Sequence, residues 1–379
     1  MKFLQIHTFY PSYLSRFYAN RPSLIDGPPD AIEPEMLADG FGAGHMWASF
    51  LRKAGHETKL IIANDIIAQG KWAAQNLGKL SLKKKSEWVR KIALEQVNRF
   101  DPEVLHLGDP VVFDMDFVRQ LKKRPRWVIG WRAAPTPDTV NWSGMDLLLS
   151  HLDTCLRFGW KHGVRDARFL YPGFPRLVAA EAGQAEPKHD VVFCGNWTAD
   201  HAKRNNLIIK VVKASKRKDK PFNLGLYLEC HDPSMMPEAV RNLNQGSRWG
   251  MEMYRTLRSG RIAINAEIDM GRGNAGNMRL FEATGLGTFL LTENNPNLDR
   301  YFTPGKEVET FQKADDLIAK IDSYLADSSA RERIAKAGQA RCLTEHETGG
   351  RVKALEGMLC GSPGGIATTL RSAWKRVTA

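Results

Sequence analysis

The chain has 379 residues and a formal net charge of +12 at pH 7, with 43% hydrophobic and 25% charged residues. This length fits two domains of ordinary size, and the balance is that of a globular protein with a sizeable core, which excludes a disordered or fibrous chain. No apolar run approaches the roughly 20 residues that a membrane-spanning helix needs. The positive charge bears on partners: nucleic acid, anionic lipid headgroups and phosphate-bearing substrates all fit it.

Part of the positive charge is clustered in two segments, Lys83–Lys91 and Lys213–Lys220. Charge runs of this kind are usually solvated helix faces, and we expect no nucleic-acid partner. Five widely spaced cysteines, with no Cys-x-x-Cys pair, predict free thiols in a reducing compartment. We therefore expect a cytoplasmic protein that could touch the inner face of an anionic membrane peripherally.

The N-terminal half alternates short apolar strands with helical segments. It opens with a strand at residues 2–9, and the Pro- and Tyr-rich stretch 10–37 is expected to be a long functional loop. A glycine-rich turn leads into a helix at 43–53 and a strand at 58–63, and residues 71–99 are predicted to be helical. Further short strands are expected in PEVLHLGD, RWVIGWRA, DLLLSH and RFLYPG.

A polar stretch without periodicity, at about 178–188, marks the expected domain boundary. A second series of strands is expected in DVVFCGN, NLGLYLE, RIAINAEI, TFLLTEN and KEVETF. Alternating strands and helices are typical of parallel, doubly wound sheets. We expect an α/β fold with two Rossmann-like domains facing a cleft, residues 1–178 and 188–345. A helical segment at 346–379 would then cross back to the N-terminal domain.

The first candidate site lies in the segment GFGAGH. Ligands of doubly wound sheets bind at the carboxyl ends of strands, near helix N-termini. Gly44 and its neighbouring glycines would let the backbone approach a ligand, and the helix start that follows favours anions. His45 stands at this helix start and is suited to deprotonating a hydroxyl near neutral pH. Equally, the histidine could only cap or pack, and the glycines only turn the chain.

The second candidate site lies in the segment LHLGD. Asp109, at the end of the predicted strand, could orient a catalytic imidazole or could be a turn residue. His106 lies within the strand, where a histidine is more often a buried core residue. Asp114-Met115-Asp116 matches the Asp-x-Asp pattern of metal-dependent sugar transferases, but its place before a predicted helix favours an N-cap. We expect no metal site and no bound cofactor.

A literal GxGxxG pattern appears late in the chain. Gly271, Gly273 and Gly276 fall between a predicted strand and helix, and Glu293 follows at a distance suited to a dinucleotide ribose. The pattern keeps an NAD(P)-dependent oxidoreductase as a rival function.

Arg279 and Glu282 lie one turn apart on the helix that follows, on a shared face. A surface salt bridge alone would stabilise little there. A carboxylate that accepts two ribose hydroxyls, beside an arginine near a diphosphate, uses both residues better. Upstream, Gly195 ends a strand, and Arg204 on the next helix could reach a phosphate or be a surface arginine.

The segment that begins NMRLFEATGLGTFLLTENN resembles the C-terminal half of GT-B glycosyltransferases (group 1), most closely the group with CgeB-like C-terminal domains. The features follow in the same order: Arg-Phe-Glu-Ala on a helix, Gly-x-Gly, an apolar strand, a Tyr-Phe-x-Pro-Gly-Lys-Glu turn, then Asp-Asp-Leu and a helix pair. The resemblance covers about residues 260–345 well. The N-terminal half resembles this fold only in outline, through GFGAGHMWASFLRKAGHE.

The resemblance implies that Glu282 binds the ribose of a nucleotide-sugar. It also implies that Arg279, Asn277 and the backbone from Gly273 to Gly276 lie near the diphosphate, with TGLG keeping the turn into the strand tight. Retaining members often carry another Glu eight positions before the ribose Glu, where this chain has Asn274.

His45 stands where some inverting members place their base, so the comparison leans toward inversion. The sequence therefore predicts a metal-independent glycosyltransferase that uses a UDP-, GDP- or dTDP-sugar. The expected acceptor is a hydroxyl of a glycan, lipid-linked or protein-linked molecule. A nucleotide-sugar isomerase of the same fold, and a non-catalytic protein that binds nucleic acid or membrane, remain alternatives.

Overall fold

The structure is a computed structural model that describes residues 1–78, 85–171, 173–183, 186–267, 269–271 and 273–359. The chain divides into two compact units. The N-terminal unit comprises Met1–Ala38, His45–Tyr171 and the described chain from Val352 onward. The C-terminal unit comprises Asp39–Gly44 and the described residues from 173 to Arg351.

This division differs from the boundary expected at 178–188. Helix α9 (Arg176–Ala182) belongs to the C-terminal unit, and so does the glycine-rich segment Asp39–Gly44, although it lies far upstream in the chain. Helix α16 (Thr348–Leu359) carries the chain back to the N-terminal unit from Val352. The remainder of the expected helical segment, residues 360–379, lies outside the described residues.

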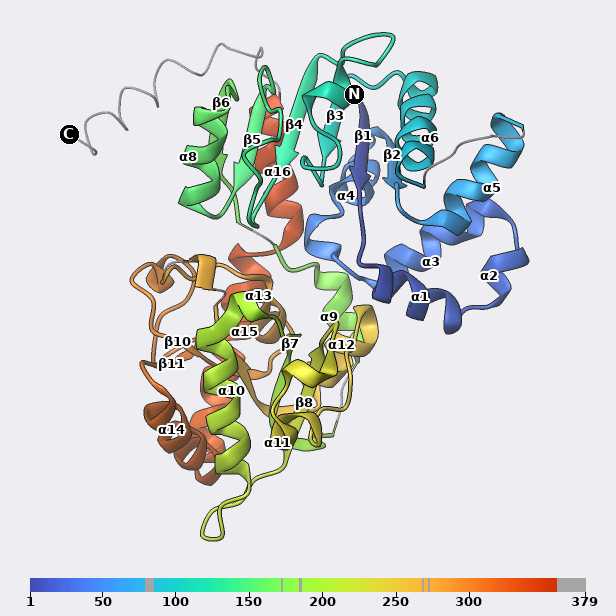
Figure 1. Cartoon of the computed structure of the whole chain (residues 1–379). Helices are drawn as coiled ribbons and strands as arrows, with labels where there is room; N and C mark the ends of the chain where they lie inside the picture. The colour runs from blue at the N-terminus through green and yellow to red at the C-terminus, as the bar shows by residue number, and fades with distance from the viewer. Residues whose placement is uncertain (79–84, 172, 184–185, 268, 272, 360–379) are drawn as a thin grey trace, which may run out of the picture. The chain divides into compact units, whose positions relative to one another are not determined.

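Six parallel strands form the sheet of the N-terminal unit, in the order β2-β1-β3-β4-β5-β6 (Figure 1). They are β1 (Lys2–His7), β2 (Glu57–Ile62), β3 (Val104–Leu107), β4 (Trp127–Trp131), β5 (Leu147–Ser150) and β6 (Asp166–Phe169). The helices before α9 are α1 (Pro11–Ala19), α2 (Ser23–Asp26), α3 (Ile32–Asp39), α4 (Trp47–Lys53), α5 (Ile66–Asn76), α6 (Lys85–Phe100), α7 (Met115–Val118) and α8 (Asp153–Lys161), with short 3-10 helices η1 (Pro29–Ala31) and η2 (Ala43–His45). The strand order changes direction between β1 and β3, which makes their carboxyl ends the ligand-binding switch point of such a sheet.

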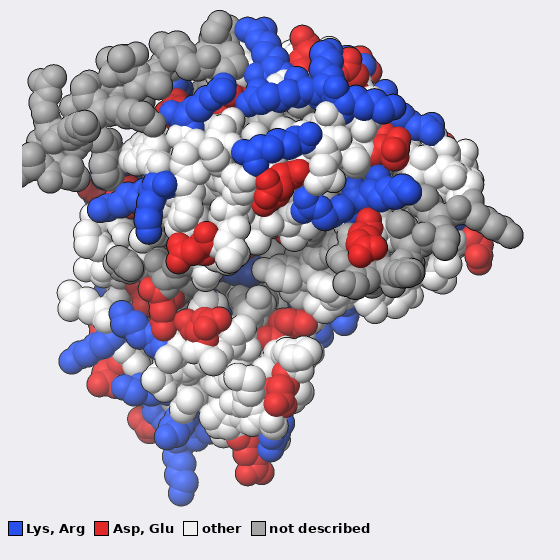
Figure 2. Space-filling model, turned by 45° about the horizontal axis from the view of Figure 1, so that its top comes forward, with Lys and Arg blue, Asp and Glu red and all other residues white. Residues whose placement is uncertain are grey.

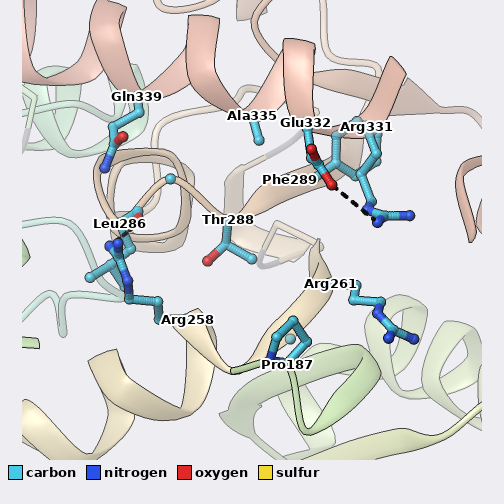
Figure 3. A pocket seen from close by; sticks show the side chains of 12 residues that line it. Pro187, Arg258, Arg261, Leu286, Thr288, Phe289, Arg331, Glu332, Ala335 and Gln339 are labelled. Atoms are coloured by element: carbon cyan, nitrogen blue, oxygen red, sulfur yellow. Dashed lines mark hydrogen bonds and ion pairs between the residues drawn. The ribbon is translucent and has the colours of Figure 1, made fainter. Parts of the chain in front are cut away.

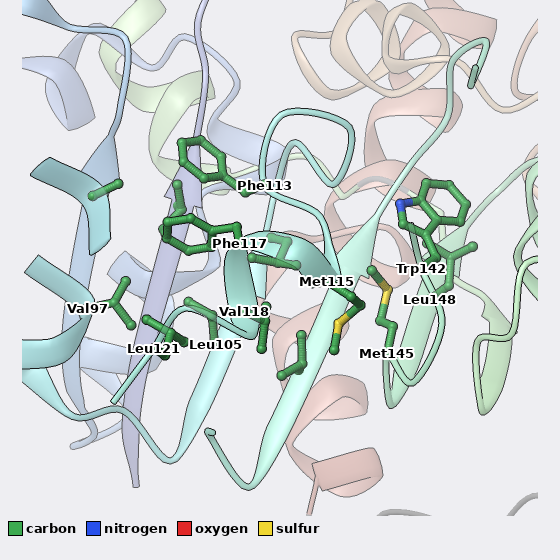
Figure 4. Close-up of a cluster of buried hydrophobic side chains, with 14 of the residues drawn as sticks. Val97, Leu105, Phe113, Met115, Phe117, Val118, Leu121, Trp142, Met145 and Leu148 are labelled. Atoms are coloured by element: carbon green, nitrogen blue, oxygen red, sulfur yellow. The ribbon is translucent and has the colours of Figure 1, made fainter. Parts of the chain in front are cut away.

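Both faces of this sheet are covered, so its strands are almost continuously apolar. One face packs on a cluster that includes Phe113, Phe117 and Trp142 (Figure 4). The other face packs on a cluster that contains Trp47 of α4 and residues of α16. His106 is buried in β3 and its ring stacks on Trp47 with 4.6 Å between centroids, so the core interpretation of this histidine is confirmed.

The stretch 10–37 was expected to be a loop, and that prediction is wrong because most of it is helical. Pro11 is the first residue of α1, where its missing N–H leaves no helical hydrogen bond unmade. The buried side of α1 has helical spacing and consists of Tyr13, Leu14, Phe17 and Tyr18. Tyr18 donates a hydrogen bond of 2.7 Å to Asp65, which caps α5. The helical spacing of these buried side chains determines the local structure here, although the stretch is rich in proline and tyrosine.

Two other local predictions concern this unit. The helix expected at 71–99 is α5 and α6, and residues 79–84, including two lysines of the first basic run, lie outside the described residues. Asp114 caps α7 by accepting hydrogen bonds from the N–H groups of Asp116 (3.2 Å) and Phe117 (3.3 Å). The N-cap interpretation of this Asp-x-Asp triplet is therefore confirmed.

Five parallel strands form the sheet of the C-terminal unit, in the order β11-β10-β9-β7-β8. They are β7 (His189–Asn196), β8 (Leu224–Glu229), β9 (Gly260–Asn265), β10 (Phe289–Glu293) and β11 (Glu309–Phe311). The helices are α10 (Ala202–Ser215), α11 (Glu238–Arg241), α12 (Gly250–Arg258), α13 (Met278–Gly285), α14 (Ala314–Ala326) and α15 (Ser328–Glu345), with 3-10 helices η3 (Ala199–His201), η4 (Pro233–Met235), η5 (Asp269–Gly271) and η6 (Leu298–Arg300). The order changes direction between β7 and β9, so the second switch point lies at their carboxyl ends.

The turn from α13 into β10 is as tight as the sequence predicts. A Cβ at Gly285 would stand 2.2 Å from the ring of Phe174, and Gly287 has a φ of +77°. Only glycine fits both conditions without strain. The turn therefore fixes where α13 ends relative to the start of β10.

Further predictions can be checked within the described ranges. Four cysteines there carry free thiols, as expected: Cys155, Cys194, Cys230 and Cys342. None of the described helices combines the length and the apolar character that a membrane span requires.

Candidate functional site

The switch point of the C-terminal unit is built around the start of α13. The side chain of Asn277 caps this helix, accepting a hydrogen bond from Leu280 N–H (3.2 Å), and donates to Asn265 (2.9 Å) at the end of β9. Asn265 in turn donates to Thr292 of β10 (3.1 Å). These bonds hold a helix N-terminus, a site that favours anions, against the carboxyl ends of two strands.

A buried carboxylate organises the loop before α13. Glu267 accepts hydrogen bonds from the N–H groups of Gly276 (3.2 Å) and Asn277 (3.5 Å), and its own N–H donates to Glu293 (2.8 Å). Gly276 has a φ of +146° and Gly273 a φ of +78°, in the region that favours glycine. The glycines of the GxGxxG pattern therefore shape this loop. Glu293, which the sequence offered as a ribose contact, accepts a hydrogen bond from the backbone of Glu267.

Gly44 belongs to the same unit and lies beside the start of α13. A Cβ on Gly44 would stand 2.5 Å from the carbonyl oxygen of Gly173 and 3.0 Å from the side chain of Met278. Gly195 lies in β7, where an added Cβ would meet the ring of Phe193 at 3.0 Å. Of the predicted glycines, Gly44 therefore packs closely beside the start of α13, and Gly195 packs closely within β7.

Arg279 and Glu282 form a buried ion pair. Their N–O distance is 2.8 Å, and the side chains are 15% and 9% exposed. Arg279 also donates to the carbonyl oxygen of Cys194 (3.3 Å) on β7. Burial raises the pKa of Glu282, and the charge of Arg279 opposes that shift. A buried pair of this kind need not stabilise a fold more than apolar residues would, so its presence directs attention to function.

Arg204 brings a second buried guanidinium to the same switch point. It lies in the first turn of α10 and donates a hydrogen bond to the carbonyl oxygen of Asn196, the last residue of β7. Its Nε has no hydrogen-bond partner among the residues that the structure describes. Burial lowers the pKa of Arg204 to about 10, and the nearby charge of Arg279 adds to this shift. A buried N–H without a partner is costly, and an anion would satisfy it.

Glu267 makes the stability of the protein depend on pH. Burial raises the pKa of its carboxyl to about 7, against the hydrogen bonds from Gly276 and Asn277. Because the folded carboxyl holds its proton more tightly than the unfolded one, the free energy of unfolding should fall as pH rises from about 4.5 to about 7, by up to about 3 kcal/mol. Glu267→Gln should remove this part of the loss. Urea unfolding at pH 5 and pH 8 measures it.

A matched control for this prediction is Glu238→Gln on the exposed side of α11. The control variant should keep the wild-type pH dependence. Equal losses of stability in wild type and Glu267→Gln between the two pH values would contradict the prediction.

The switch point of the N-terminal unit brings His7 and Asp109 together. His7 ends β1, and its Nδ1 lies 2.7 Å from the carbonyl oxygen of Thr8. A carbonyl only accepts, so Nδ1 carries the proton and Nε2 is the basic nitrogen. Gly108 makes room for the ring, because a Cβ there would stand 2.5 Å from it. Asp109 accepts a hydrogen bond of 2.5 Å from the hydroxyl of Thr8.

The electrostatics of His7 follow from this arrangement. Burial lowers the pKa of its imidazole, and the charge of Asp109 partly offsets the shift. Arg132 lies 4.0 Å from the Asp109 carboxylate. Asp109, predicted either to orient an imidazole or to be a turn residue, is connected to His7 through Thr8.

His45 is enclosed within the N-terminal unit. Its ring lies 4.8 Å from that of Trp131, and its Nε2 lacks a hydrogen-bond partner in the described part of the chain. Burial, followed by the nearby His7 and His151, lowers the pKa of His45 to about 3. The pKa of His7 is lowered by burial as well, but His7 differs from His45 in standing at the switch point beside Thr8 and Asp109. The signal missed in the sequence was the position of His7 as the last residue of the first strand.

Comparisons with known proteins bear on the family and the fold. Residues 210–357 match the family model described as "Glycosyl transferase-like", a segment that includes all of α13. The fold matches sucrose-phosphate synthase from Thermosynechococcus elongatus, with a TM-score of 0.55, 10% identity and coverage of 95% of this chain and 98% of that one. It also matches HepE from Anabaena in complex with UDP-glucose, with a TM-score of 0.57, 10% identity and coverage of 95% and 99%. The chain has the GT-B fold of these glycosyltransferases, and its residues 210–357 are glycosyl transferase-like.

A third match in fold is AviGT4, a glycosyltransferase of avilamycin A biosynthesis, with a TM-score of 0.55, 14% identity and coverage of 94% and 96%. A search of curated proteins found no sequence match. At these identities the solved structures establish the fold, and the comparisons taken together do not favour the rival oxidoreductase. The segment that matches the family model contains Arg279 and Glu282, whereas Arg204 and His7 lie before that segment.

Proposed function

We propose that the protein is a glycosyltransferase that moves a sugar from a nucleoside-diphosphate sugar to a hydroxyl of its acceptor, and that the donor is a UDP-sugar. The observation that carries this proposal is a pair of guanidiniums, the buried one of Arg204 and the partly buried one of Arg279, beside the N-terminus of α13 at a topological switch point. HepE, which has the same fold, was solved with UDP and with UDP-glucose, which supports UDP over GDP or dTDP.

The donor's nucleotide is proposed to lie along α13. Glu282 would accept hydrogen bonds from the ribose hydroxyls while Arg279 holds its carboxylate in place. The diphosphate would lie between Arg204 and the helix start at Asn277, where the backbone from Gly273 to Gly276 can approach it closely. Gly44 and Gly195 would not contact the nucleotide directly; they would allow the close packing around α13 and β7 beside it.

The leaving diphosphate needs positive charge as the glycosidic bond to it breaks. Arg204, Arg279 and the N-terminus of α13 supply that charge, so we propose a transfer that does not depend on a metal ion. Turnover should persist in excess EDTA. A loss of turnover that added Mg²⁺ or Mn²⁺ restores would contradict this part of the proposal.

The acceptor is proposed to be deprotonated by His7. Its Nε2 takes the hydroxyl proton as the acceptor oxygen bonds to the anomeric carbon and the diphosphate departs. Asp109 holds Thr8 and so keeps His7 in its tautomer. Asn274 donates to Gly271, so the position of the second retaining-type Glu offers no carboxylate, which supports inversion. The anomer of the product tests that outcome.

The acceptor class is proposed from surface charge. Lysine and arginine side chains gather across the upper part of Figure 2, over the N-terminal unit. Exposed residues of this kind include Lys122, Lys123, Arg124 and Arg126. They suit a glycan or lipid-linked acceptor at the cytoplasmic face of an anionic membrane.

A calorimetric panel tests the proposed donor. Titration with UDP, GDP, dTDP and CDP should show binding for at least one diphosphate, with UDP the tightest. The matching UDP-sugars should then release UDP in the presence of an acceptor. Binding of NAD or NADP with no response to any nucleoside diphosphate would contradict the proposal.

A further inference from the structure

A polar cavity lies at the amino edge of the C-terminal sheet, opposite the switch point. It has a volume of about 340 Å³ and is bordered by the starts of β9 and β10, the end of α12 and the first half of α15 (Figure 3). This volume falls within the roughly 300–1,000 Å³ typical of small-molecule sites. The carboxyl edge that carries Arg204 and Glu282 is the other end of the same strands, so the proposed donor does not account for this cavity.

Three arginines from three different elements line the cavity. They are Arg258 of α12, Arg261 of β9 and Arg331 of α15, and Glu332 is the one acidic residue among its described lining. Burial lowers the pKa of Arg331; the carboxylate of Glu332 opposes that shift, and the charge of Arg261 adds to it. Asp190 pairs with Arg261 at 2.6 Å, and Glu332 lies 3.9 Å from Arg331, so three guanidiniums stand against two carboxylates around the cavity.

Hydrogen-bond acceptors stand beside these cations. Thr288 donates its hydroxyl proton to the carbonyl oxygen of Leu257 (3.2 Å), which leaves its oxygen as an acceptor. Gln339 donates through its amide nitrogen to Gly285 (3.1 Å), which leaves its Oε1 as an acceptor. Figure 3 shows Thr288 in the middle of the cavity, with Arg261 and Arg331 on one side and Gln339 on the other.

We propose that this cavity binds a small sugar phosphate. The phosphate would lie between Arg261 and Arg331, whose planar guanidiniums suit phosphate oxygens. The sugar hydroxyls would donate to Thr288 and Gln339. An isolated inorganic phosphate would use only the arginine side of a cavity of this size. The inference is independent of the donor site and does not rest on the proposed function.

Calorimetry in the presence of saturating UDP tests the proposal, because UDP keeps probes away from the donor site. The probes are glucose 6-phosphate, fructose 6-phosphate, mannose 1-phosphate and inorganic phosphate. At least one sugar phosphate should bind, and at least about 10-fold more tightly than inorganic phosphate. Arg261→Glu should weaken that binding by 10-fold or more, whereas Arg241→Ala on exposed α11 should leave it unchanged.

Arg261 is exposed, so its replacement should not prevent folding, and a second variant, Gln339→Leu, checks the sugar end. Gln339→Leu should weaken the binding of the sugar phosphate and leave the binding of inorganic phosphate unchanged. No binding by any of the three sugar phosphates would overturn the proposal. Binding that Arg261→Glu leaves intact, or equal affinity for inorganic phosphate, would overturn it too. If the protein fails to bind UDP, the same variants still decide whether this cavity is a site.

Discussion

Arg204→Met is expected to weaken the binding of UDP by about 10- to 100-fold. A hydrogen bond from a charged group contributes about 1.5–3 kcal/mol, and 1.4 kcal/mol corresponds to a factor of ten in affinity. The unpartnered Nε of Arg204 is ready to make such a bond with the diphosphate. The same variant should weaken the binding of inorganic pyrophosphate by a similar factor, because Arg204 is proposed to contact the phosphates. Isothermal calorimetry on the folded variants measures both affinities.

Glu282→Gln separates the ribose contact from the phosphate contact. It should weaken UDP by about 10-fold or more while leaving pyrophosphate unchanged, since the carboxylate is assigned to the ribose. Lys203→Met, one residue before Arg204 and exposed, is the matched control and should bind both ligands as wild type does. If Glu282→Gln binds UDP normally, the Arg279–Glu282 pair is structural and the ribose assignment is wrong.

His7→Ala is expected to lower turnover by about 100-fold or more while UDP affinity stays the same. General-base catalysis contributes about 10²–10⁴-fold, and His7 lies in the N-terminal unit whereas the proposed donor contacts lie in the C-terminal unit. Steady-state kinetics with a UDP-sugar, together with UDP calorimetry, measures the split. Because burial lowers the pKa of His7, its basic form should persist below the ordinary imidazole range, and activity with it.

Comparing His45→Ala with His7→Ala shows which of the two histidines acts as the base. His45→Ala removes the imidazole that the sequence favoured, and His231→Ala, at an exposed position, serves as the control. We expect His45→Ala to change stability more than turnover, because its ring packs against Trp131. A large loss of turnover in His45→Ala with normal turnover in His7→Ala would return the base role to His45.

The strands were predictable because parallel strands covered on both faces are apolar runs, as in Trp127–Trp131. The helices in residues 10–37 were missed because proline and tyrosine received more weight than the spacing of Leu14 and Phe17. The division of the chain was harder still. Asp39–Gly44 joins the C-terminal unit through tertiary contacts, such as the hydrogen bond of 3.1 Å from Tyr254 to the carbonyl oxygen of Gly40. No local pattern contains that information.

The candidate site divides in the same way. Arg279 and Glu282 could be found because their spacing and surroundings resemble a known family. Glu267 and His7 could not, because their placement at the switch points depends on strand order: each lies at or just beyond the carboxyl end of a strand. Sequence order alone does not say that β1 neighbours β3 or that β7 neighbours β9.

A crystal structure of the complex with UDP tests the central claim most directly. The account predicts the ribose hydroxyls within hydrogen-bond distance of the Glu282 carboxylate, and the diphosphate in contact with Arg204 and the start of α13. A nucleotide bound elsewhere, with Glu282 still paired only to Arg279 and Arg204 untouched, would contradict it.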